Sequence, residues 1–167
     1  MNKIVANYPV SADVLQNKLL FALKDRYCSK IWLGYAEVIF AGFDPELILY
    51  SERQYRPPFE IHTHYADWLL EKNGVVVVSN SDNRERILIE TKDILLKKVS
   101  NWNYSEENFE LRIEIEETWV LVIKPWVATA VKSNHPPSDA WALRFQSEGY
   151  YSVDCKGNRS FQPSASG

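Results

Sequence analysis

Cysteine, glycine and histidine are scarce in this sequence, and long apolar runs are missing. The chain has two cysteines, six glycines and three histidines among its 167 residues. Two widely separated cysteines, together with an N-terminus that lacks the apolar stretch of a secretory signal, predict a cytoplasmic protein with reduced thiols. The longest aliphatic block is the run of valines at residues 75–78, far shorter than the roughly 18 apolar residues that cross a bilayer, so we expect no membrane span.

The common signatures of nucleotide binding and of nucleophilic catalysis are also missing. No Gly-x-Gly-x-x-Gly, Gly-x-x-x-x-Gly-Lys or Gly-x-Ser-x-Gly pattern occurs, so neither a phosphate-binding loop nor the serine elbow of α/β hydrolases is expected. The net charge of −3, with 22 acidic and 19 basic residues, argues against a nucleic-acid surface. These absences favour a protein without a cofactor and without catalytic activity.

The composition is that of an ordinary globular protein. Apolar residues make up 46% of the chain and charged residues 25%, and a chain of this length can bury a core without disulfides or metal. We predict a single α+β domain over residues 1–160 and a flexible C-terminal tail over residues 161–167. The fold class is mainly antiparallel β-sheet, made of hairpins and meanders, with one or two packed helices.

The first third of the chain predicts one helix and two strands. Ser11 can cap a helix over residues 11–24, in which Leu15, Leu19 and Leu23 share one face. Residues 30–40 show the two-residue periodicity of a strand, and a turn at residues 42–45 leads into a second strand over residues 46–52. The prolines at positions 57 and 58 then indicate a kink or a strand crossing.

Residues 59–72 admit two interpretations, a strand that leads into a short helix at residues 66–71, or one long and bulged strand. We favour the strand because Asn73-Gly74 is followed at once by four valines, and Asn-Gly before a β-branched run indicates a type I′ hairpin turn. A second helix is predicted over residues 84–97, where Ile87, Leu88 and Ile94 fall at helical spacing.

The remaining sequence predicts strands. Residues 99–104, 109–115 and 119–124 indicate a β-meander, because apolar residues alternate with charged ones most clearly from Phe109 to Ile115. A final hairpin is expected from residues 140–145 and 150–155. Residues 46–52 can also be laid over residues 110–116, and one interpretation of this similarity is an internal pseudo-duplication of two strand-turn-strand halves.

One short motif could hold a metal ion. Glu60, His62 and His64 alternate along the predicted strand, so their side chains would project from one face, and His135 could return from its loop to complete the site. Nitrogen and oxygen ligands of this kind suit zinc or another divalent metal. The alternative is a solvent-exposed face, because Ile61 and its neighbours of the same parity supply the core side.

Aromatic residues are abundant, with six tryptophans and nine tyrosines. Tryptophan and tyrosine dominate the hot spots of protein interfaces because they bury a large area with few rotatable bonds. We expect about half of them in the core and the rest in a recognition patch for a protein or a small ligand. The candidate partner-binding residues are aromatic or acidic: Trp102, Tyr104, Glu106, Glu107, Trp119 and Trp126.

The order of these predicted elements also suggests a family. The pattern includes Trp68 in the long strand, Leu95-Leu96-Lys97-Lys98-Val99 after the second helix, and Asp139-Ala140-Trp141-Ala142-Leu143 before the Gly149 hairpin. Over about residues 30–158 it resembles a family of small uncharacterised bacterial proteins, some of which are immunity proteins of polymorphic toxins. The resemblance implies a compact β-rich fold and a toxin as the neutralised partner.

Three hypotheses for the function result. The leading one is a non-catalytic binding protein that acts as an immunity protein. The first alternative is a metal-dependent enzyme or metal-binding protein that uses the His-x-His strand. The second is a small-ligand binding module with an aromatic-lined pocket.

Overall fold

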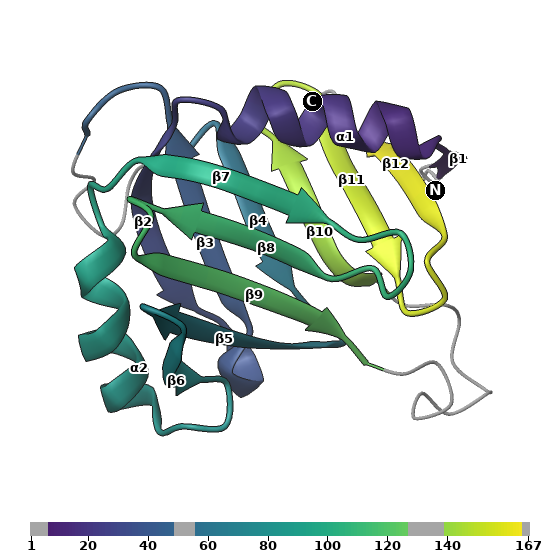
Figure 1. Cartoon of the computed structure of the whole chain (residues 1–167). Helices are drawn as coiled ribbons and strands as arrows, with labels where there is room; N and C mark the ends of the chain where they lie inside the picture. The colour runs from purple at the N-terminus through teal and green to yellow at the C-terminus, as the bar shows by residue number, and fades with distance from the viewer. Residues whose placement is uncertain (1–6, 49–55, 127–138, 165–167) are drawn as a thin grey trace.

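The computed structural model describes residues 7–48, 56–126 and 139–164. These residues form two antiparallel β-sheets, of seven and five strands, together with two α-helices. Figure 1 shows the five-stranded sheet in front of the seven-stranded sheet, with the strands of one sheet running across those of the other. The mainly antiparallel β architecture agrees with the sequence-based prediction. Within the described segments, no helix is long and apolar enough to cross a membrane.

The two sheets combine strands that are distant in the sequence. The seven-stranded sheet has the order β1-β12-β11-β10-β4-β3-β2, and the five-stranded sheet has the order β6-β5-β9-β8-β7. The strands of the first are β1 (Tyr8–Pro9), β2 (Tyr27–Leu33), β3 (Ile39–Asp44), β4 (Phe59–Thr63), β10 (Asp139–Phe145), β11 (Gly149–Asp154) and β12 (Arg159–Pro163). Those of the second are β5 (Ala66–Lys72), β6 (Val75–Ser79), β7 (Val99–Tyr104), β8 (Leu111–Ile115) and β9 (Trp119–Pro125).

The first helix, α1 (Ala12–Leu23), confirms the prediction for residues 11–24. The Ser11 side chain caps it by accepting a hydrogen bond from the Val14 N–H, and the helix lies along one edge of the sandwich (Figure 1). The second helix, α2 (Arg84–Thr91), is shorter than predicted and continues only as a 3₁₀ turn, Lys92–Ile94. It cannot continue because Leu96 has a φ of 65° and its N–H donates to the Cys28 carbonyl.

A single hydrophobic core takes side chains from both sheets and both helices. Its two largest members are tryptophans whose indole N–H groups are satisfied although the rings are buried. Trp68 Nε1 donates to the Glu37 carbonyl at 2.8 Å, and Trp141 Nε1 donates to the Phe109 carbonyl at 3.0 Å. The core therefore holds each indole in one orientation.

Several local predictions are confirmed. Asn73 and Gly74 have φ values of 51° and 79°, as a type I′ turn requires, and they join β5 to β6. The meander β7-β8-β9 and the hairpin β10-β11 form as predicted. Residues 59–72 are extended rather than helical, but they change sheets at His64 and Tyr65: β4 belongs to the seven-stranded sheet and β5 to the other.

The predicted strand over residues 30–40 is wrong in its middle. The chain reverses there between β2 and β3, and the Gly34 N–H donates to the Val38 carbonyl at 2.9 Å to close the turn. Ala36 and Glu37 have φ values of 53° and 56°. Neither alanine nor glutamate favours a positive φ, so the sequence gives no turn signal here and the apolar alternation wrongly predicted a continuous strand.

The second predicted strand and the turn before it also need correction. Gly42 lies inside β3 rather than in a turn, and it pairs with Lys30 and Glu60 on the neighbouring strands. Glycine is required there because Pro57 packs directly onto it: a Cβ at Gly42 would lie 2.3 Å from Pro57 Cγ. Residues 46–48 are not a strand, and residues 49–52 lie outside the described residues. The internal pseudo-duplication, which depended on this strand, is unconfirmed.

Part of the segment predicted as a C-terminal tail, residues 161–167, belongs to a strand. Strand β12 runs to Pro163 and pairs with β11, and the Phe161 ring stacks on Tyr151 with the ring centroids 4.7 Å apart. Residues 161–163 therefore belong to the sheet. The hydrophobic contact of Phe161 explains why this short polar segment is ordered.

Candidate functional site

The outward face of strand β4 carries Glu60 and His62 in the interior of the seven-stranded sheet, and His64 follows directly after the strand. The solvent-face alternative is wrong for two of them: Glu60 is 0% exposed and His62 is 6% exposed, whereas His64 is exposed. Pro57 contributes to this burial because it crosses the same face above Gly42, the cross-strand partner of Glu60.

Two arginines hold the buried Glu60 carboxylate. Arg56 donates to it in a bidentate manner, from Nε and Nη2 at 3.2 Å each, and Arg144 Nη2 lies 3.4 Å from Oε2. Arg144 also donates to the Pro57 carbonyl at 2.7 Å, which fixes the crossing segment. Burial alone would raise the pKa of Glu60, but His62 and the two guanidinium groups outweigh it and lower that pKa. Glu60 is therefore an anion, and its negative charge stabilises the positive charges of Arg56 and Arg144.

The two histidines lie side by side. Their ring centroids are 4.8 Å apart in an edge-to-face arrangement, and His62 also contacts the rings of Phe40 and Tyr150. His62 Nδ1 lies 3.8 Å from Glu60 Oε1, too far for a hydrogen bond, and it has no other hydrogen-bond partner among the described residues. Burial, followed by the proximity of His62, lowers the pKa of His64.

Asp139 approaches the histidines from strand β10. Burial raises its pKa, while a hydrogen bond with Ser152 and the nearby His64 and His62 act in the opposite direction. Ser152 comes from β11, where it is the cross-strand partner of Ala142. Its hydroxyl is thus paired with a carboxylate and not with an imidazole, which is not the arrangement that activates a serine nucleophile.

Small side chains create a polar hollow at this point of the sheet. Across the strands, His62, Ala142 and Ser152 form one row, and Glu60, Arg144 and Tyr150 form the next. Because Ala142 and Ser152 are short, their taller neighbours enclose a depression of about 300 Å³. Nine residues from the outward face and the crossing segment line it: Phe40, Arg56, His62, His64, Asp139, Ala142, Tyr150, Ser152 and Gln162.

The metal hypothesis gains no support from this geometry. Among the described residues, no group of three or more His, Cys, Asp or Glu side chains is arranged to hold a metal ion. Both oxygens of Glu60 already accept from arginine, and His135 lies outside the described residues. A metal site at Glu60, His62, His64 and His135 stays a prediction, which elemental analysis of a His62→Ala/His64→Ala double variant would test.

Neither cysteine is activated for nucleophilic chemistry. Burial raises the pKa of Cys28 to about 12, and burial together with Asp154 raises the pKa of Cys155. Because the thiolate is the reactive form, both thiols are weak nucleophiles at neutral pH.

The six candidate partner-binding residues differ in their exposure. Trp102 packs against the core and Tyr104 is buried in it, while Glu106 and Glu107 are exposed in the turn before β8. Trp119 starts strand β9, where Lys72 and Lys97 lie over its ring. Trp126 follows the other end of β9.

Trp126 forms an exposed aromatic pair that the sequence did not predict. It is 40% exposed, and its ring contacts that of Tyr65, which is 37% exposed, at a centroid distance of 5.4 Å. Its indole N–H donates to Asp67 at 3.2 Å. The pair lies next to the corner where the chain passes from β4 to β5, beside His64.

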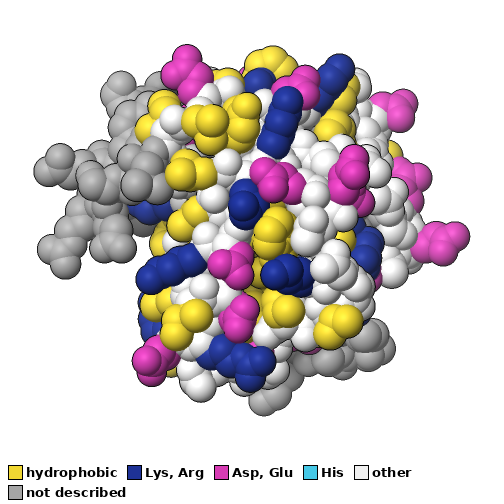
Figure 2. Space-filling view, turned by 60° about the vertical axis from the view of Figure 1, so that its left-hand side comes forward, with side chains coloured by type: hydrophobic (Ala, Val, Ile, Leu, Met, Phe, Trp, Pro, Cys, Tyr) yellow, Lys and Arg dark blue, Asp and Glu magenta, His cyan; other side chains and the backbone are white. Residues whose placement is uncertain are grey.

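Two other regions of the surface differ from the polar hollow. Figure 2 shows the side that carries α2, where hydrophobic side chains form small patches among charged side chains of both signs.

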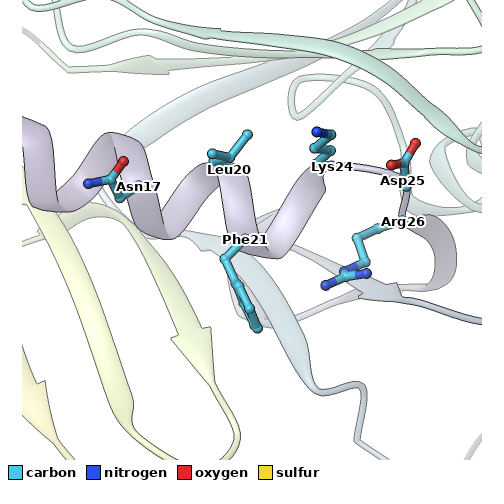
Figure 3. Close-up of a pocket in the computed structure, with 6 residues that line it drawn as sticks. All are labelled: Asn17, Leu20, Phe21, Lys24, Asp25 and Arg26. Atoms are coloured by element: carbon cyan, nitrogen blue, oxygen red, sulfur yellow. The ribbon is translucent and has the colours of Figure 1, made fainter.

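A second hollow of about 440 Å³ lies at the C-terminal end of α1 (Figure 3), lined by Asn17, Leu20, Phe21, Lys24, Asp25 and Arg26. The Arg26 guanidinium there stacks against the rings of Phe21 and Phe59. This second hollow is formed by long side chains at one helix end.

Sequence reasoning missed most of the lining of the polar hollow. It identified His62 and His64, but not Arg56, Asp139 or Tyr150. One usable signal was Arg144, a charged residue inside the apolar run of β10, since a charge in a central strand requires a partner.

Comparison with known proteins does not identify this chain. No family model, no curated protein and no solved structure matches it significantly. The resemblance to immunity proteins therefore stays an expectation from the hydrophobic pattern.

Proposed function

We propose that this chain is a non-catalytic binding protein whose recognition site is the polar hollow on the seven-stranded sheet. The observation that carries the proposal is His62. This side chain is more than nine-tenths buried, lines the hollow, and has a ring nitrogen without a hydrogen-bond partner in the described part of the chain. A buried polar group of this kind is expected to pair with a bound molecule or water.

The rest of the lining supports binding over catalysis. Hydrogen-bonding groups from β4, β10, β11 and β12 converge on a space that can accept a small molecule or the end of a partner side chain. Ser152 is paired with a carboxylate, and both cysteine thiols have raised pKa values. These features favour recognition without covalent chemistry.

Filling the hollow tests the proposal. In the Ala142→Leu variant a larger side chain would occupy its floor, whereas Asn103→Leu introduces the same apolar residue at an exposed position of β7, away from the hollow. A thermal-shift screen with amino acids, carboxylic acids, sugars and nucleotides should give at least one compound that stabilises the wild type and Asn103→Leu but not Ala142→Leu. Equal stabilisation of all three proteins, or none of any, contradicts the proposal.

A second candidate function is the neutralisation of a protein partner, such as a toxin encoded by an adjacent gene. The exposed pair of Tyr65 and Trp126 supports it, because exposed tryptophan and tyrosine are typical of interface hot spots. The test co-expresses the neighbouring gene product with the wild type, with Trp126→Ala and with Tyr35→Ala, which removes a highly exposed ring elsewhere. Trp126→Ala alone should lose protection of the host, and protection by all three proteins refutes this candidate.

A further inference from the structure

The hollow carries opposite charges at its two ends. At one end the Arg56 guanidinium, with 52% of its side chain exposed, lies on the buried Glu60 carboxylate, and Arg144 contacts the same carboxylate. Two positive charges against one negative charge leave this end positive, and Tyr150 lines it. At the other end Asp139 supplies a carboxylate to the lining. A dipolar site of this kind is complementary to a dipolar ligand.

The strand geometry sets the distance between the two ends. Asp139 begins β10, and Arg144, which contacts Glu60 at the other end of the hollow, is five residues further along the same strand, so their Cα atoms lie roughly 16 Å apart. Asp139 is next to His64 along the sheet, because the Tyr65 N–H donates to the Asp139 carbonyl at 3.2 Å. Charge-assisted hydrogen bonds of about 2.8 Å occupy part of this distance at each end. The charges of a bound ligand would therefore be well separated, which favours a linear molecule over a compact one.

These observations deepen the proposed function and rest on it. We infer that the hollow binds a linear zwitterion of the ω-amino-acid type, with its carboxylate on Arg56 and Tyr150 and its ammonium group on Asp139. The charges of an extended six-carbon ω-amino acid are separated by its methylene chain, and lysine offers a similar separation. The methylene chain lies over Ala142, beside the ring of Phe40, which lines the same hollow.

A ligand with a single charge fits the hollow less well. Hexanoate would form no ion pair with Asp139, and hexylamine would form none with Arg56, so each forfeits a charge-assisted hydrogen bond that the zwitterion makes. His62 lies between the two ends, and its Nδ1 has no hydrogen-bond partner in the described segments.

Isothermal titration calorimetry with a matched set of compounds tests the inference. The probes are 6-aminohexanoate, hexanoate, hexylamine and 4-aminobutanoate, which vary the two charges and the distance between them. We expect 6-aminohexanoate to bind the wild type at least about tenfold more tightly than each of the other three.

Variants assign each end of the ligand. Asp139→Asn should weaken 6-aminohexanoate by about tenfold or more while leaving hexanoate unchanged, and Arg56→Gln should weaken it similarly while leaving hexylamine unchanged. Asp93→Asn, an exposed carboxylate beside α2, is the matched control and should bind like the wild type. Circular dichroism confirms that each variant is folded before titration.

The outcomes separate this inference from the proposed function. If hexanoate or hexylamine binds as tightly as 6-aminohexanoate, or Asp139→Asn binds it like the wild type, the zwitterion is the wrong ligand class. If none of the four binds the wild type, the inference is likewise wrong. In both cases the hollow still stands as a binding site when Ala142→Leu abolishes binding of any compound in the thermal-shift screen. The proposed function itself fails only when filling the hollow changes nothing.

Discussion

Replacing Glu60 by glutamine should destabilise the protein strongly. The Glu60 carboxylate is 0% exposed and pairs with Arg56 and with Arg144, whose side chain is only 8% exposed. The variant leaves the Arg144 charge buried without a counter-ion, a change that typically costs about 3–5 kcal/mol. For a chain of this length, that loss corresponds to a fall in melting temperature of roughly 6–20 °C.

Urea denaturation measures this effect against a matched control. Glu71 forms an ion pair of the same kind with Arg112 at 3.2 Å, but its partner's side chain is 40% exposed, so Glu71→Gln should cost less than about 1 kcal/mol. Replacing Arg144 by methionine in the Glu60→Gln background removes the orphaned charge and should recover part of the loss. Equal losses for Glu60→Gln and Glu71→Gln would refute the reasoning.

The difference in unfolding free energy between the wild type and Glu60→Gln should also depend on pH. The pKa of Glu60 in the folded protein is lowered below its ordinary value, so its stabilising contribution is complete above the ordinary carboxyl pKa of about 4.3. That contribution is lost as the pH falls through the lowered pKa. The difference in unfolding free energy between the wild type and Glu60→Gln should therefore be constant above about pH 5 and shrink in stronger acid. A difference that grows on acidification would contradict the assignment.

Further predictions concern two glycines, the core and the Cys28 thiol. Gly149→Ala should cost more than about 3 kcal/mol in urea denaturation, because Gly149 has a φ of 141° and a Cβ there would lie 2.1 Å from the Gln162 carbonyl oxygen. Gly74→Ala, with a φ of 79° and no atom within 4 Å of the added Cβ, should cost only about 1 kcal/mol, and a larger loss would contradict this. Ile113→Ala, which truncates a fully buried side chain, should cost about 2–5 kcal/mol. Iodoacetamide at pH 8 should leave Cys28 unmodified in the folded protein and modify it in urea, as mass spectrometry can verify, since its pKa is about 12.

Local sequence signals predicted the parts of the fold whose cause is local. The Asn73-Gly74 turn forms because both residues accept a positive φ, and the alternation from Leu111 to Ile115 places the apolar side chains in the core. The turn after β2 escaped prediction because Ala36 and Glu37 adopt positive φ values that their residue types do not signal. In that turn tertiary contacts decide the conformation.

The candidate site was predicted only in part, for a related reason. The spacing of Glu60, His62 and His64 correctly indicates a shared face. Whether that face meets water depends on Pro57, which packs on Gly42, and on Arg144, which is distant in the sequence. Such long-range contacts leave no periodic pattern in a single sequence.

The corner between β4 and β5 links the motions of the two sheets. Only His64 and Tyr65 separate these strands, and the corner is hydrogen-bonded on both sides: His64 N–H donates to the Ala140 carbonyl, and the Tyr65 carbonyl accepts from the Trp126 N–H. Because Trp126 follows β9 and Ala140 belongs to β10, neither sheet can open at this point without disturbing the other. The central amides of both sheets should then exchange with solvent deuterium at one common rate, that of global unfolding, and the sandwich behaves as a single cooperative unit.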